Sequence, residues 1–104
     1  MLNRRQGLAL ARNLRSELER RNVPLQQLFL FGSVARDTAH EGSDIDIAVV
    51  CTPFKSTRHE EDMELRSARR SIDTRISPVS LHPEDFDDAF FGLAQEVKRH
   101  GIAV

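Results

Sequence analysis

Two short stretches, FLFGSVAR at residues 29–36 and SDIDIAVV at residues 43–50, decide the fold of this chain. Each joins an apolar run of the length of a buried strand to polar residues at one of its ends. In the second stretch, apolar and acidic residues alternate, which is typical of a strand with one buried face. The two stretches therefore predict two core strands with polar groups at their ends.

The acidic residues of the second stretch predict a metal site. Asp44 and Asp46 are two residues apart on a strand, so their side chains leave the same face. Two adjacent carboxylates repel each other, and we expect a raised pKa in one of them unless a cation lies between them. Mg²⁺ removes that cost and is usually held by one or two carboxylates together with substrate phosphates. A solvated polar strand end is the alternative for an isolated pair of this kind.

The polar end of the first stretch predicts an anion site. Gly32 follows the strand directly and lets the backbone approach a ligand closely. Ser33 is expected to cap the short helix that follows, whose first N–H groups attract anions. A plain turn is the alternative for Gly-Ser alone. If the two strands are neighbours, a metal-bound triphosphate fits between these groups, with Arg36 close by.

Apolar spacing along the rest of the chain predicts an α+β domain with helices packed on a small sheet. We expect helices over residues 4–21, over residues 60–70 and from Pro83 to the cap at Gly101. We expect strands over residues 25–31, 44–51 and 72–81, and Pro78 places the last strand at a sheet edge or a bulge. The side chains expected to point inward from the last two helices are Met63, Leu65, Ala68, Phe86, Phe90, Leu93 and Val97.

Composition excludes several classes of protein. With 104 residues and 39% hydrophobic residues, one globular domain over residues 1–104 is expected. No apolar run approaches the roughly 18 residues that cross a membrane, so a cytoplasmic protein is expected. One cysteine, Cys51, excludes an internal disulfide and a cysteine-based zinc cluster. The four histidines are scattered and are expected at the surface.

Charge gives a further exclusion and one open alternative. The chain has 15 Lys and Arg against 16 Asp and Glu, and it lacks Tyr and Trp, so nucleic acid is not an expected partner. Residues 4–21 alone carry six Arg against two Glu. This basic face of the first helix is either solvated or a docking surface for an acidic partner.

The motif Gly32-Ser33-x-x-Arg36, followed by Ser43-Asp44-x-Asp46, resembles the signature of the minimal nucleotidyltransferase domains. These domains are small relatives of the DNA polymerase β superfamily, and the resemblance extends over most of the chain. It implies a mixed β-sheet flanked by helices. It also implies Mg²⁺-dependent transfer of a nucleoside monophosphate from an NTP, with ATP expected, to a hydroxyl, with release of pyrophosphate.

The resemblance assigns a role to each motif residue. Gly32 and Ser33 would hold the β- and γ-phosphates. Arg36 would steady the loop or contact phosphate, and Ser43 completes the phosphate-binding set. Asp44 and Asp46 would be catalytic metal ligands in a two-ion site.

A third catalytic carboxylate is implied on a later strand, and the sequence leaves its position open. Aligned by residue type, Asp73 is the third metal ligand, and we favour this alignment. Aligned by distance to the last helix, the position belongs to Ser77, which would weaken the second metal site.

The resemblance and the shortness of the chain together suggest a protein substrate. Short members of the family act beside a small helical HEPN-type protein, as antitoxins that adenylylate a tyrosine of that toxin. Substrate recognition would then come from this partner or from self-association. The alternatives are a module with slow catalysis that neutralises its partner by contact, and a nucleotide-binding or regulatory subunit.

Overall fold

The two stretches that decide the fold form adjacent strands in the computed structural model, which describes residues 2–104. Strand β1 (Leu25–Phe31) runs antiparallel to β2 (Ile45–Cys51). Six of the seven residues of β2 are buried, because the strand lies between two layers of helices. The expected pair of core strands is confirmed.

Two further strands complete a mixed sheet in the order β3-β2-β1-β4. Strand β3 (Ile76–Leu81) is parallel to β2 and forms one edge, where Pro78 was expected. Strand β4 (Ile102–Ala103) is antiparallel to β1 and forms the other edge. Sequence periodicity missed β4, because two residues carry no detectable alternation. The mixed sheet flanked by helices confirms the expected α+β fold.

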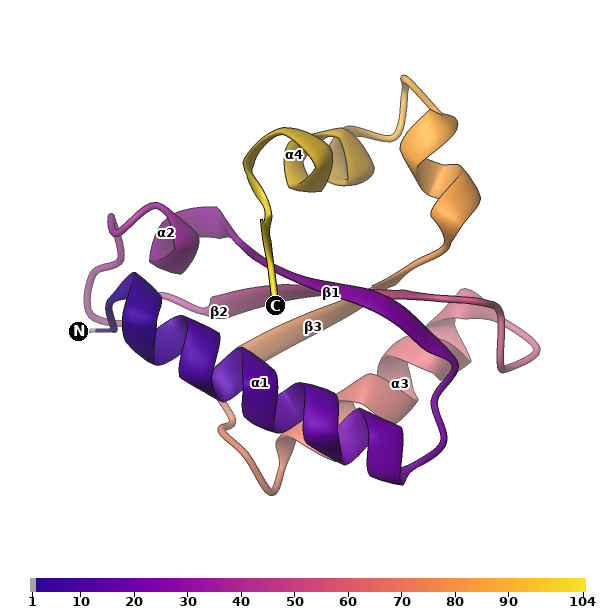
Figure 1. Ribbon diagram of the computed structural model, residues 1–104, viewed down its shortest axis with the longest axis horizontal. Coiled ribbons are helices and arrows are strands. Elements are labelled where there is room, and N and C mark those ends of the chain that lie inside the picture. The colour runs from indigo at the N-terminus through magenta and orange to yellow at the C-terminus, as the bar shows by residue number, and fades with distance from the viewer. Residues whose placement is uncertain (1) are drawn as a thin grey trace.

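The helices cover the two faces of the sheet unequally (Figure 1). The longer helices α1 (Arg4–Arg20) and α3 (Arg58–Arg69) pack on one face. The 3₁₀ turn η1 (Pro83–Asp87) and the short helix α4 (Gly92–His100) lie on the other. The second face is therefore covered by shorter elements, and α4 packs there with Phe31 at the end of β1.

Helix α1 begins where the sequence predicts. The Asn3 side chain accepts a hydrogen bond from the Gln6 N–H, and the Gln6 side chain accepts one from the Asn3 N–H, which forms a capping box. Leu14 and Leu18 are fully buried against the sheet, and each contributes roughly 1.5–3 kcal/mol through apolar burial. No helix within residues 2–104 is both long and apolar enough to cross a membrane.

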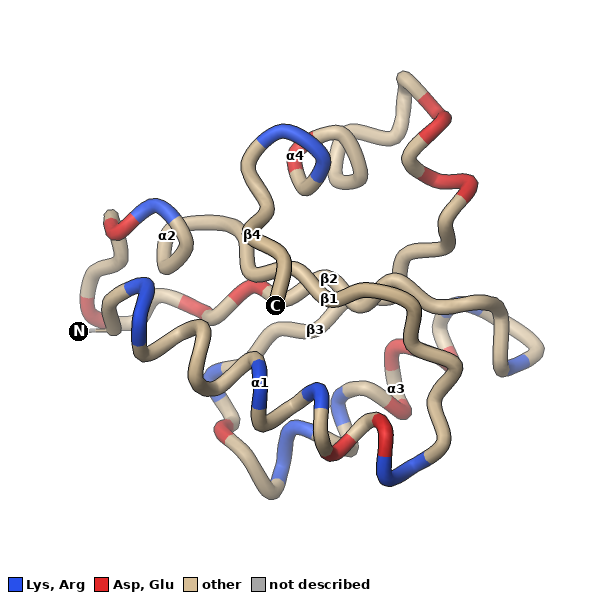
Figure 2. The backbone as a smooth tube through the Cα atoms, in the orientation of Figure 1, with Lys and Arg blue, Asp and Glu red and all other residues tan. Residues whose placement is uncertain are grey.

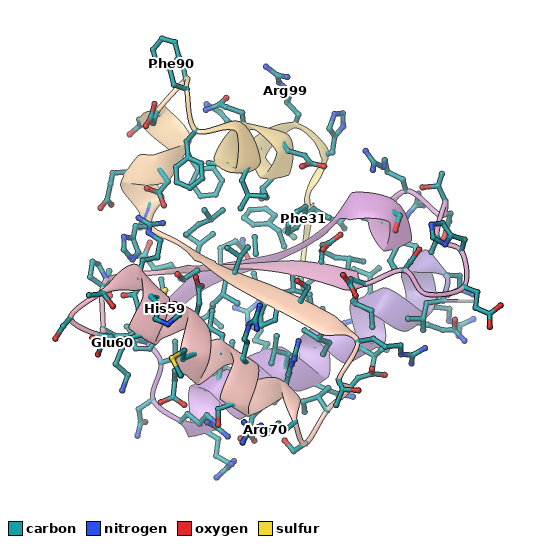
Figure 3. The ribbon with its side chains drawn as sticks, turned by 180° about the vertical axis from the view of Figure 1, so that it is seen from behind. Phe31, His59, Glu60, Arg70, Phe90 and Arg99 are labelled. Atoms are coloured by element: carbon teal, nitrogen blue, oxygen red, sulfur yellow. The ribbon has the colours of Figure 1, made fainter. Side chains whose placement is uncertain are left out.

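Two of the inward side chains predicted from the sequence are exposed. Met63 is 57% exposed, because α3 turns Glu61, Leu65 and Ala68 inward and a residue two positions after Glu61 points away from them. Leu65 and Ala68 are buried as predicted. Phe90 is 98% exposed and stands away from the domain at the tip of a loop (Figure 3).

The segment from Pro83 onward is not one helix. Asp88 interrupts it: its side chain accepts a hydrogen bond from the Phe90 N–H, and its carbonyl accepts one from the Phe91 N–H. This turn separates η1 from α4 and places Phe90 outside the core. The third strand is also shorter than predicted. It begins at Ile76, after a turn in which Asp73 binds Arg75.

Candidate active site

The turn from β1 into the short helix α2 (Gly32–Ala35) brings the two predicted polar groups together. Gly32 has a φ of +72°, a left-handed conformation that residues with a side chain rarely adopt. A Cβ atom at this position would lie 2.2 Å from Oδ2 of Asp46. The strand register explains this approach, because Phe31 on β1 pairs with Asp46 on β2. Glycine is therefore needed both for the turn and for the carboxylate beside it.

Positive charge only partly compensates the carboxylates at this turn. Asp46 is half-buried, and Asp44 is exposed just ahead of β2. Burial raises the pKa of Asp46, the charges of Asp44 and Glu96 raise it further, and Arg36 opposes them. This confirms the expected raised pKa in one of the two aspartates. None of the ion pairs formed within residues 2–104 includes Asp44, Asp46 or Glu96.

A pocket of about 500 Å³ opens beside this turn, and residues of both motif stretches line it. The motif residues that line it are Gly32, Ser33, Arg36 and Asp46. The other lining residues are Phe31, Ser77, Val79, Leu93 and Glu96. Figure 3 shows Phe31 between the sheet and α4, which forms the roof of this region. The pocket volume lies within the usual range for small-molecule sites.

Ser33 lines the pocket but does not cap α2 as predicted. The helix begins one residue earlier, at Gly32, and its N-cap is Phe31, which has no side-chain acceptor. The Ser33 carbonyl instead accepts a hydrogen bond from the Thr38 N–H at 2.9 Å, which closes the loop after α2. Arg36 follows α2 as its exposed C-cap and presents a cation at the pocket rim.

Ser43 lies outside the pocket and organises the loop before Asp44. Its hydroxyl accepts a hydrogen bond from the His40 N–H at 2.9 Å, and its own N–H donates to the His40 carbonyl at 3.0 Å. Ser43 therefore fixes the path of the chain into β2. Its predicted contact with phosphate stays a prediction.

The structure places Ser77, and not Asp73, beside Asp46. In the parallel pairing of β2 with β3, Asp46 is the register partner of Ser77, and both line the pocket. Asp73 lies in the turn before β3, where its carboxylate accepts hydrogen bonds from the Arg75 N–H at 2.8 Å and from the Arg75 guanidinium at 2.7 Å. These bonds from Arg75 lower the pKa of Asp73. The geometry favours the alignment by distance to the last helix.

Glu96 is the pocket residue that sequence reasoning missed. It stands three residues after Leu93 on α4, and side chains three apart on a helix share a face. That spacing was the only signal available in the sequence. Nothing near Glu96 in the chain indicated that α4 lies over the end of β1.

A second polar cluster lies at the far end of β2 and is internally satisfied. Potential metal-ligating atoms of Cys51, Glu61 and His82 lie within 4.8 Å of one another. Glu61 Oε1 is 2.7 Å from His82 Nε2, and Arg58 contacts His82 Nδ1 at 3.1 Å. Burial and the Glu61 charge raise the pKa of Cys51 to about 12, which keeps the thiol neutral. The prediction that His82 lies at the surface is wrong, since it is buried in this network.

Comparison with known proteins places the motif in its family. The family profile of the nucleotidyltransferase domain matches residues 11–98. The chain belongs to the nucleotidyltransferase domain family. No match is found among curated proteins.

Solved structures resemble this nucleotidyltransferase domain over most of its length. A putative nucleotidyltransferase from Sulfolobus solfataricus is 23% identical with a TM-score of 0.66, over 96% of this chain and 80% of that one, and shows the same fold. A toxin-antitoxin structure with AMP-PNP is 31% identical with a TM-score of 0.55, over 88% of this chain and 69% of that one. A complex of tri-AMPylated Shewanella oneidensis HEPN toxin with MNT antitoxin matches at 28% identity and a TM-score of 0.55, over 93% of this chain and 70% of that one.

Proposed function

We propose that this nucleotidyltransferase domain transfers AMP from ATP to a hydroxyl of a HEPN-type partner protein and thereby acts as an antitoxin. The observation that carries the proposal is the half-buried Asp46 carboxylate, packed against the Gly32 backbone and lacking a cationic partner within residues 2–104. Such a carboxylate is costly unless a ligand supplies positive charge.

The residues of the site fit a hard divalent cation such as Mg²⁺. The donor set consists of carboxylate oxygens from Asp44 and Asp46, and the absence of a Cβ at Gly32 makes room for the Asp46 carboxylate beside the turn. These two aspartates would hold the ion. When bound, Mg²⁺ neutralises phosphate charge and lowers the pKa of an attacking hydroxyl.

The motif residues that line the pocket beside Asp46 would bind the phosphates of the nucleotide. Gly32 and Ser33 lie where the triphosphate would meet the turn, and Arg36 offers a cation to its phosphates. The partner hydroxyl oxygen forms a bond to the α-phosphorus, and the bond from that phosphorus to the bridging oxygen breaks. Pyrophosphate leaves with the electron pair, and the hydroxyl proton passes to solvent.

Two similar structures support ATP as the nucleotide and a HEPN-type protein as the partner. One similar structure holds AMP-PNP, and another joins an MNT antitoxin to an AMPylated HEPN toxin. The basic residues along α1 give this chain a surface for an acidic region of such a partner (Figure 2). Arg5 and Arg12 line a surface hollow on this helix together with Leu8.

Neutralisation by contact is the second candidate function. It is favoured by Ser77, which supplies no charge at the register position beside Asp46 and so predicts slower catalysis. In this case α1 binds the toxin, and the pocket retains nucleotide without efficient transfer.

A paired assay separates the two functions. A candidate helical protein encoded beside this chain is incubated with the chain, Mg²⁺ and ATP, and the mass and the toxicity of the candidate are both measured. Transfer predicts a mass increase of the partner by AMP, with toxicity restored by the D44N/D46N double variant. An unmodified partner that the double variant still neutralises would overturn the enzymatic proposal and leave contact as the function.

A further inference from the structure

The pocket has a negatively charged wall that the motif does not include. Ser77 occupies the β3 position beside Asp46, so β3 contributes a hydroxyl and no charge there. Helix α4 lies across the pocket and contributes Leu93 and Glu96. Glu96 is half-buried, and no cation within residues 2–104 pairs with it.

The position of Glu96 is fixed by packing at both ends of its segment. Ala94 and Val97 are buried and pack with Phe31 against the sheet. After α4 the chain turns at Gly101, whose N–H donates to the Val97 carbonyl at 2.8 Å. A Cβ atom at Gly101 would lie 3.2 Å from the Cβ of Phe29, so the chain passes close to β1.

Strand β4 completes this anchor. Ile102 pairs with Leu30, one residue before the Phe31 that pairs with Asp46. The C-terminal segment is therefore held against the same end of β1 that carries the Gly32 turn. This register brings α4 to the pocket, where Glu96 and Asp46 both line the wall.

We propose that Glu96 supplies the third carboxylate of the divalent-cation site, in the place that Ser77 leaves without charge. The inference rests on the proposed function of the pocket. It follows from two observations. Glu96 and Asp46 line the same pocket, and neither side chain forms an ion pair within residues 2–104. Oxygen ligands from separate elements suit the octahedral demand of Mg²⁺.

This arrangement makes the cation site depend on the C-terminal segment. Asp44 and Asp46 come from the start of β2, whereas Glu96 comes from α4, which β4 docks onto β1. Cation binding then joins two parts of the chain that are far apart in sequence. We expect bound Mn²⁺ to slow hydrogen exchange in α4 as well as around the start of β2.

The test is a Mn²⁺ titration of the purified chain by isothermal titration calorimetry, with an ATP analogue that cannot be cleaved. The variants are E96Q, D46N and, as a control with the same charge change, Asp87→Asn on the exposed surface of η1. We expect E96Q to weaken Mn²⁺ binding at least about tenfold, because loss of a group that only orients a metal ligand already costs about 10–100-fold in affinity. Asp87→Asn should leave the affinity unchanged.

The outcomes separate this inference from the proposed function. If D46N weakens binding and E96Q binds Mn²⁺ as the unmodified chain does, Glu96 is not a ligand and the function stands. If D46N also binds normally, the proposed function itself fails. Should E96Q lower the melting temperature, the S77D/E96Q double variant decides. Recovery of Mn²⁺ binding supports the inference, and no recovery overturns it.

Discussion

Acidic residues lie near both ends of strand β2, but protein partners compensate their charge at only one of the two ends. At its start, Asp46 and Glu96 face one pocket without a cationic partner within residues 2–104. Near its other end, Glu61 is 1% exposed but binds His82, and its second carboxylate oxygen accepts a hydrogen bond from the Phe54 N–H at 2.9 Å. The more deeply buried acid is the one whose charge the fold already compensates.

This difference separates acids that hold the fold together from the acids that the proposed function assigns to a ligand. The network around Glu61 ties α3 to the segment after β3, since Arg58 binds Asp85 at 2.6 Å and the Asp85 carboxylate accepts the His82 N–H at 2.7 Å. By contrast, no ion pair among residues 2–104 involves Asp44 or Asp46 at the start of β2. Under the proposed function, these are the charges that a bound cation would neutralise.

The largest expected effect comes from removing charge at the start of β2. D46N should lower the rate of AMP transfer by roughly 10²–10³-fold, the usual loss when one preorganised electrostatic contact of an active site is removed. Because burial and the charges of Asp44 and Glu96 both disfavour the ionised Asp46, the thermal midpoint should stay constant or rise. The checks are the initial rate of AMP transfer and a circular dichroism melt. A rate within twofold of that of the unmodified chain would show that the Asp46 charge does not serve the reaction.

At the other end of β2 the change should act on stability. Glu61→Ala leaves the His82 ring and the Phe54 N–H without their acceptor in a buried site. We expect a loss of about 2–4 kcal/mol in the free energy of unfolding, from unsatisfied buried groups. Urea unfolding followed by circular dichroism measures it. A loss below about 0.5 kcal/mol would mean that the network is not structural.

Acid should affect the two ends in opposite directions. The pKa of Asp46 is raised, so its charged form is destabilising at neutral pH, and this cost disappears as pH falls through the raised pKa. The pKa values of Glu61 and Asp85 are lowered by their hydrogen bonds, so their stabilisation is lost as pH falls through those values. Melting curves of D46N and the unmodified chain at several pH values test this. Any stability gained by D46N at pH 7 should vanish in acid, and a constant gain would contradict the assignment.

The smallest expected effect belongs to Asp73. Asp73→Asn should change Mn²⁺ affinity by less than about twofold, because the carboxylate is engaged by Arg75 in the turn before β3. Its loss should cost about 0.2–1 kcal/mol of stability, as for other solvent-accessible ion pairs. The same calorimetric titration reports the affinity. A tenfold drop would return Asp73 to the set of metal ligands.

The sequence predicted the site where local pattern and geometry coincide. Backbone freedom predicts the role of Gly32 and strand alternation predicts that of Asp46, and both properties are local to a few residues. The buried strands β1 and β2 were predictable for the same reason. The cap role of Ser33 was not, because a shift of one residue in the start of α2 removes it.

Residues placed by distant contacts escaped prediction. Glu96 reaches the pocket through the pairing of Ile102 with Leu30, which connects the end of the chain to β1. His82 is buried by its contacts with Glu61 on α3 and Asp85 on η1, and no spacing within the sequence predicts these contacts. Helical spacing predicts Phe90 in the core, but the turn at Asp88 interrupts the helix and places Phe90 outside it.

Nucleotidyl transfer is tested by which phosphate of labelled ATP reaches the partner protein. The chain and its partner are incubated with Mg²⁺ and ATP labelled at either the α- or the γ-phosphate. The proposal predicts that label from the α-phosphate appears on the partner protein, whereas label from the γ-phosphate is released in pyrophosphate. Label from the γ-phosphate on the partner, or no label from either ATP, would contradict nucleotidyl transfer by this pocket.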